Sequence, residues 1–251
     1  MGIIRVNTEI WAGSTEFVRA QIEEARQDRN IKAVIVQFNS PGGEVVASQT
    51  LYLELQNLRR EMPVVGSIDS MAASGAYYAA MGVDPIYAKP SSSIGNVGVW
   101  AFVPSDLGVN DVILTSGPFK LTGSNRDEFI RKLDGIKQEF LATVFSQRND
   151  NLILSPAELS QGLLYPGRKA VHLGLIDHIG TQTEAIAAAA KQAGIAHYEV
   201  VDLEARIIED WFGEDFLWGE PWSGAADPVT GERSLPYGIY LLYDARLRGT
   251  P

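Results

Sequence analysis

The sequence of 251 residues contains no cysteine and only three histidines, His172, His178 and His197. The lack of cysteine excludes disulfides, thiolate zinc sites, iron–sulfur clusters and a cysteine nucleophile. The three histidines do not form the HExxH pattern of a zinc peptidase. The sequence therefore predicts a protein that works without a metal or another cofactor.

Positive charge is also scarce, because 21 lysines and arginines face 31 aspartates and glutamates, for a net charge of −10. A nucleic-acid-binding protein needs a basic surface, so we expect no nucleic acid as partner. The sequence lacks an apolar run of about 18 residues and a basic-then-apolar signal at its N-terminus. We expect a cytoplasmic protein, or one at a membrane surface through an anchor that this chain lacks.

What the sequence does contain is an alternation of strand-like and helix-like segments. Residues 33–38 (AVIVQF) form a continuous apolar run, which is typical of a strand buried in a parallel sheet. The alternation predicts an α/β fold with right-handed crossovers, a mostly parallel sheet and flanking helices. The other expected strands are at 3–11, 64–68, 85–88, 97–103 and 112–115, and the clearest expected helices are at 126–148 and 182–193.

The first candidate for chemistry is Ser74, in the segment Met71-Ala-Ala-Ser-Gly-Ala-Tyr-Tyr78. A serine at a turn from strand to helix places its hydroxyl at a helix N-terminus, where free N–H groups and the helix dipole favour negative charge. Gly75 follows and can bring its N–H close to a reacting carbonyl. The simpler interpretation is that Ser74 only caps the helix.

The second candidate is the loop Ser40-Pro41-Gly42-Gly43, directly after the buried strand. Two glycines allow backbone geometry that other residues avoid, and they leave N–H groups unobstructed. Such a loop can supply an oxyanion donor and an edge for an extended peptide. The simpler interpretation is an ordinary turn between strand and helix.

A serine nucleophile needs a base, and the sequence offers histidines only from His172 onward, in late segments typical of structural or surface positions. A lysine can serve instead, provided that burial lowers its pKa from the reference value of about 10.4. Lys120 lies in Ser116-Gly-Pro-Phe-Lys-Leu-Thr-Gly123, an apolar setting, so we expect it to be buried. We interpret Lys89, directly before Pro90, as an exposed strand end.

Taken in order, Ser-Pro-Gly-Gly, Met-Ala-Ala-Ser-Gly-Ala-Tyr-Tyr and Ser-Gly-Pro-Phe-Lys resemble the motifs of the signal peptide peptidase A family. Members of this family are serine proteases of the Clp protease/crotonase fold, a spiral of ββα units. The likeness runs from about residue 6 to residue 180. It includes residues 94–99 (IGNVGV), similar to the family's substrate-groove strand, and residues 165–177, similar to its closing helix and turn.

The resemblance implies a serine endopeptidase that cuts extended peptides, such as signal-peptide remnants or membrane-protein fragments. Ser74 matches the nucleophile and Lys120 the general base of the family. It also implies a ring-like homo-oligomer with active sites near subunit boundaries. The remaining matches are the oxyanion positions Gly43 and Gly75 and the substrate-binding positions Gly42, Gly95, Val97 and Gly98.

Two other functions fit the same fold. A crotonase-type enzyme acts on acyl-CoA through acidic residues and a backbone oxyanion hole, and it needs neither Ser74 nor Lys120. A non-catalytic scaffold would need none of these residues. The presence of both side chains and of both glycine motifs argues against the two alternatives.

We expect a peptidase domain at 1–198 and an acidic extension at 199–251, for which the resemblance gives no function. Residues 199–233 contain ten acidic residues and only two arginines. Aromatic side chains left in water lose about 25 cal/mol per Å², so we expect this segment to pack on its own domain or on a neighbouring subunit and to help fix the assembly. The tryptophans concerned are Trp211, Trp218 and Trp222.

Overall fold

The buried apolar run forms strand β2 (Val34–Ser40), an interior strand of a mostly parallel, eight-stranded sheet. In this computed structural model, residues 1–102, 116–117, 119–120, 122–212 and 239–242 are described. Strands β1 (Gly2–Val6) and β4 (Val64–Ala73) pair with β2 on either side, both parallel to it. The sheet continues through β5 (Ile86–Ala88) to β9 (His178–Ile179), and β10 (Val201–Asp202) closes the other edge.

On the edge away from β2, strand β4 has two successive partners, which explains why it is longer than the expected strand at 64–68. Its first part pairs with β5, and Met71–Ala73 pair with β6 (Ser93–Gly95). Strand β6 in turn pairs with β8 (Leu164–Pro166) in the antiparallel direction. Ser74, which follows β4 directly, is thereby positioned by a continuous ladder of backbone hydrogen bonds.

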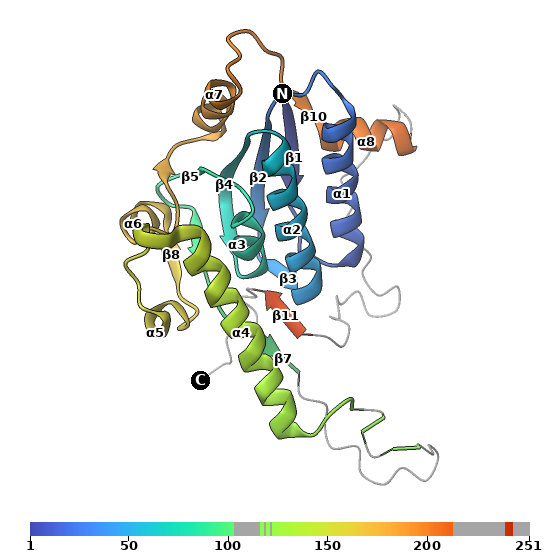
Figure 1. The fold of residues 1–251 in the computed structure, drawn as a ribbon, viewed down its shortest axis with the longest axis vertical. Helices are drawn as coiled ribbons and strands as arrows, with labels where there is room; N and C mark the ends of the chain where they lie inside the picture. Colours follow the sequence, from blue (N-terminus) through green and yellow to red (C-terminus); the bar gives the residue numbers. More distant parts are fainter. Residues whose placement is uncertain (103–115, 118, 121, 213–238, 243–251) are drawn as a thin grey trace.

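Helices cover both faces of the sheet (Figure 1). On one face, α1 (Ala12–Gln27), α2 (Val45–Glu61) and α3 (Gly75–Ala80) bury side chains such as Ile22 and Leu55 against β1, β2 and β4. On the other face, α7 (Gln182–Ala193) packs its alanines against the alternate residues of the same strands. The expected α/β architecture is confirmed.

The longest helix, α4 (Arg126–Arg148), has the boundaries that the sequence predicts. Its start is fixed by Asn125, whose side chain accepts a hydrogen bond from the Glu128 N–H at 2.8 Å. Its second half packs against the hydrophobic core through Phe140 and Val144, whereas Ile130 in the first half is 52% exposed. Figure 1 shows the first half projecting beyond the sheet and the other helices. Short helices α5 (Pro156–Leu159) and α6 (Gly167–His172) and a 3₁₀ turn (Asn149–Asn151) follow.

Three strand predictions were wrong in length or cannot be compared. The strand expected at 3–11 ends at Val6, because a turn and α1 follow. In the strand expected at 97–103, of which residues 97–102 are described, the described strand is β7 (Trp100–Ala101). The strand expected at 112–115 lies outside the described residues.

The first part of the acidic extension belongs to the fold. Strand β10 pairs with β1, and helix α8 (Leu203–Phe212) packs on α1 and β1. On β1, Arg5 forms an ion pair with Asp202 at 2.6 Å. Trp218 and Trp222 lie outside the described residues, as does the side chain of Trp211, and the role of the extension in assembly stays a prediction. No helix among the described residues is long and apolar enough to span a membrane.

A buried ion pair ties the end of α4 to the segment after α6. Arg148 is only 5% exposed, and its guanidinium lies 2.7 Å from the Asp177 carboxylate. The Arg148 Nε also donates to the Gly174 carbonyl at 2.7 Å, and the Ile86 N–H donates to Asp177 at 2.8 Å. Removing one member of such a pair leaves the other charge buried without its partner.

We therefore expect Arg148→Ala to lower the free energy of unfolding by about 3–5 kcal/mol, measured by chemical denaturation. The matched control is Arg19→Ala, which removes the exposed pair between Arg19 and Glu16 and should cost less than about 1 kcal/mol. Equal losses in the two variants would contradict a special contribution from the buried pair.

Candidate active site

Ser74 lies at the turn between β4 and α3 in a backbone conformation that serine rarely adopts. Its φ is 52° and its ψ is −119°. A non-glycine residue held in such a region costs on the order of 1–3 kcal/mol. Two backbone hydrogen bonds hold it there, from the Ser74 N–H to the Gly95 carbonyl (2.8 Å) and from the Tyr78 N–H to the Ser74 carbonyl (2.9 Å).

The side chain of Ser74 does not act as a helix cap. Ser74 occupies the N-cap position of α3, but its hydroxyl makes no capping hydrogen bond. The simpler interpretation of this serine as a cap is therefore wrong. Ser74 is therefore strained and almost fully buried, and its hydroxyl is not used by the helix. These properties suit a candidate nucleophile.

The N–H of Gly75 is close to the Ser74 hydroxyl by chain connectivity. Gly75 is the first residue of α3, and the first N–H groups of a helix have no partner within that helix. The N–H therefore points out of the helix beside Ser74, where it can stabilise a developing oxyanion. The role of Gly75 as an oxyanion donor stays a prediction.

Gly43 lies in strand β3 (Gly42–Glu44), which contacts α3. The Ile10 N–H donates to the Gly42 carbonyl (2.7 Å), and the Glu44 N–H donates to the Ile10 carbonyl (2.8 Å). A Cβ at position 43 would lie 1.8 Å from the Ile10 carbonyl oxygen, so only glycine fits. The Gly42 N–H is bound to the Ser40 hydroxyl at 3.1 Å. Successive residues of a strand direct their backbone groups to opposite edges, so the Gly43 N–H faces away from Ile10.

The expected groove residues differ in what they present. Gly95 has a φ of +108°, and its carbonyl accepts the hydrogen bond of the Ser74 N–H, so it positions Ser74. The side chain of Val97 is buried in the core, which leaves only its backbone for a substrate. Gly98 has no heavy atom within 4 Å of a Cβ built on it, so space is open there. Asn96, which sequence reasoning overlooked, links this segment to Gly162 through its side-chain amide at 2.7 Å.

Lys120 and Ser74 differ in their surroundings within one chain, since Ser74 is buried. Lys120 is exposed, in the segment that precedes α4, and Figure 1 shows this segment beyond the projecting end of that helix. The expectation that Lys120 is buried is therefore wrong for the single chain, in which the preceding residue Phe119 is also 47% exposed.

The other candidate bases are less suitable. Lys89 is exposed, as expected, and its ammonium pairs with Asp69. All three histidines are exposed, on α6, on β9 and in the loop before β10. Burial raises the pKa of Tyr77 and of Tyr78 above the usual range, so both phenols on α3 stay protonated at neutral pH.

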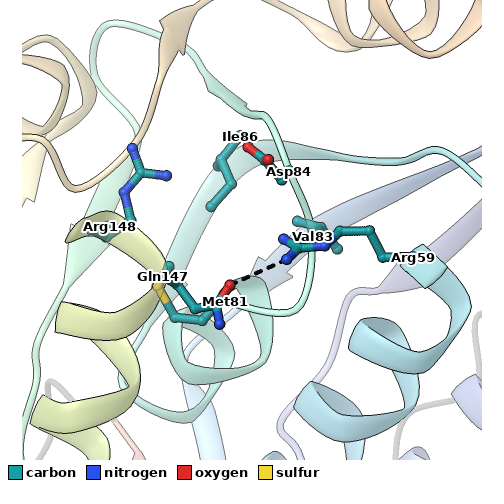
Figure 2. A pocket seen from close by; sticks show the side chains of 7 residues that line it. All are labelled: Arg59, Met81, Val83, Asp84, Ile86, Gln147 and Arg148. Carbon is teal, nitrogen blue, oxygen red and sulfur yellow. Dashed lines mark hydrogen bonds between the residues drawn. The ribbon is translucent and has the colours of Figure 1, made fainter. Parts of the chain in front are cut away.

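A small cavity at the opposite end of α3 is not the substrate site. Its volume is about 10 Å³, which is room for about one water molecule. Figure 2 shows Arg59 donating to Gln147 across its mouth, with an N–O distance of 3.4 Å. Among the described residues, no group of three or more side chains suits a metal ion. The cavity is lined by Arg59, Met81, Val83, Asp84, Ile86, Gln147 and Arg148.

Comparison with known proteins gives a consistent result. The sequence pattern of peptidase family S49 matches residues 56–196, a range that includes Ser74 and Lys120 and begins after Gly43. A Synechocystis protein with a provisional protease name is 31% identical over 221 residues, which are 82% of this chain and 78% of that protein. The chloroplastic serine protease SPPA of Arabidopsis thaliana is 29% identical over 189 residues, 70% of this chain and 28% of that protein. Protease 4 of Haemophilus influenzae is 30% identical over 192 residues, 70% of this chain and 30% of that protein.

Proposed function

Because the chain belongs to peptidase family S49, we propose that it is a serine endopeptidase that cuts extended peptides with Ser74 as nucleophile. Lys120 is the general base, and the N–H groups of Gly43 and Gly75 form the oxyanion hole. The observation that carries the proposal is the strained Ser74, whose hydroxyl makes no capping hydrogen bond with α3. Gly75 is the first residue of that helix, and α3 contacts β3, the strand that contains Gly43.

The reaction needs no group beyond these. Neutral Lys120 takes the proton of the Ser74 hydroxyl while the oxygen attacks the scissile carbonyl. The two N–H groups stabilise the resulting oxyanion. The ammonium then gives its proton to the leaving amine, and the peptide bond breaks to an acyl-enzyme. A water molecule, deprotonated by the same lysine, hydrolyses the acyl-enzyme and returns Ser74 to its starting state.

The exposure of Lys120 supports a homo-oligomer in which this lysine is desolvated. The projecting half of α4 and the segment before it expose Phe102 (53%), Phe119 (47%) and Ile130 (52%). Exposed apolar side chains of this size favour contact with another protein surface. A neighbouring copy that packs there would bury Lys120 and bring it close to a Ser74. This serine would belong either to the same chain as the lysine or to the neighbouring copy.

The substrate is an extended chain with small or apolar residues at the cut, such as a signal-peptide remnant or a membrane-protein fragment. Strands β3 and β7 each pair with the backbone of β11 (Ile239–Leu242) in this structure, and an extended peptide can form the same kind of pairing. The segment from Gly95 to Gly98 contains no charged residue, which suits a substrate with apolar side chains.

A fluorophosphonate probe tests the nucleophile directly. We expect labelling at Ser74, mapped by mass spectrometry, because the probe reacts only with an activated serine. The matched control is Ser70→Ala, which removes an exposed hydroxyl from the same strand and should leave labelling unchanged. Labelling that persists in Ser74→Ala would assign the nucleophile elsewhere.

A further inference from the structure

A strand from the far end of the chain lies where a substrate is expected. Strand β11 (Ile239–Leu242) is the middle strand of a three-stranded sheet, between β3 and β7. It is antiparallel to both, with Leu241 opposite Gly43 and Tyr240 opposite Trp100. Figure 1 shows β11 between these two strands, below α2 and α3.

The edge of β3 that β11 uses is the one that carries the proposed oxyanion donor. Ile10 already binds the Gly42 carbonyl and the Glu44 N–H on one edge of β3. The N–H and C=O of Gly43 therefore point to the opposite edge, and Leu241 is the residue that lies opposite them. An extended substrate whose carbonyl is to enter the oxyanion hole must use this same edge.

Strand β11 also contacts α3, the helix that begins after Ser74. It thus lies against the two elements that contain the proposed oxyanion donors, Gly43 in β3 and Gly75 in α3. The three strands have four residues or fewer each, so few backbone hydrogen bonds hold β11 in place. A short strand of this kind can be displaced by a peptide that makes the same bonds.

We propose that residues 239–242 are an internal pseudosubstrate, which occupies the substrate groove and holds the peptidase inactive until a substrate displaces it. This inference rests on the proposed function. A segment tethered to the same chain acts at an effective concentration of about 1 mM, so an intrinsic Kd of about 0.1 mM lowers activity about 10-fold.

The test compares two truncations of the full chain. Ending the chain after residue 238 removes β11 and is expected to raise kcat/KM for a short fluorogenic peptide about 10-fold. Ending it after residue 242 keeps β11 and should leave kcat/KM at the value of the full chain. In the intact chain, Leu241→Pro should reproduce the activation, because proline lacks the N–H needed for strand pairing.

A synthetic peptide of residues 236–245 completes the test. Added to the chain that ends after residue 238, it should inhibit competitively, and the same peptide with proline at position 241 should not. Equal activity of the two truncations, or loss of both activity and thermal stability on removing β11, would overturn the inference and make β11 a fixed part of the fold.

Fluorophosphonate labelling distinguishes failure of the pseudosubstrate inference from failure of the proposed function. If Ser74 is labelled equally fast with and without β11, the pseudosubstrate is ruled out and the serine peptidase stands. If Ser74 is labelled in neither form, the proposed function fails and the inference fails with it. Faster labelling on removal of β11 supports both.

Discussion

Ser74→Ala is expected to lower kcat/KM for peptide hydrolysis by on the order of 10³-fold or more, with no loss of fold. Without the hydroxyl no acyl-enzyme can form, and only binding and the oxyanion donors remain. The fold should persist because the hydroxyl makes no capping hydrogen bond with α3. Steady-state kinetics on a fluorogenic peptide, together with a thermal melt, measure the two effects separately.

Ser70→Ala again provides the control, since it removes an exposed hydroxyl four positions earlier on β4. Its kcat/KM should stay within about twofold of the wild-type value, as expected for a surface substitution away from the site. If Ser74→Ala retained activity within a factor of ten, another residue would have to be the nucleophile.

Lys120→Ala should be almost as damaging as Ser74→Ala, with a loss on the order of 10³-fold, because nucleophile and base act as a unit. Lys89→Ala is the control: Lys89 is the other lysine between Ser74 and α4, and it is engaged with Asp69. Its loss should change kcat/KM only slightly. A large effect of Lys89→Ala with a small one of Lys120→Ala would reverse the assignment of the base.

The exposure of Lys120 allows a sharper experiment. If the lysine of one copy serves the serine of another, mixing Ser74→Ala and Lys120→Ala subunits should restore part of the activity. If both residues act within one copy, the mixture should stay as inactive as the separate variants. Size-exclusion chromatography with light scattering on the same samples gives the oligomer mass.

The elements that the sequence predicted well are those fixed by neighbouring residues. Helix α4 begins at its expected position because Asn125 caps it. Helix α7 is bounded by Thr181 at its start and by Gly194, in the left-handed conformation, at its end. Each of these signals lies within one turn of the boundary it sets, so it can be recognised without knowledge of the fold.

The parts of the site that could not be predicted depend on residues far apart in the sequence. Two glycines after a strand indicate a special loop, but only the fold shows that Ile10 binds one edge of β3 and β11 the other. The conformation of Ser74 likewise depends on its bond to Gly95. The apolar sequence around Lys120 suggested burial, yet Lys120 and Phe119 are exposed in one chain, because sequence pattern alone does not distinguish a core segment from an exposed one.

The pairing of β1 with β10 has a consequence for the nascent chain during synthesis. A ribosome that adds about 5–20 residues per second makes the outer neighbour of β1 on the order of 10–40 s after β1 itself. During that interval the nascent chain can complete only one side of β1, and an uncovered strand edge invites pairing with other chains. Arg5 places a positive charge on this strand until β10 has been synthesised, and charges on an open strand edge hinder pairing with other chains. Its later partner, Asp202, arrives with the strand that ends the exposure.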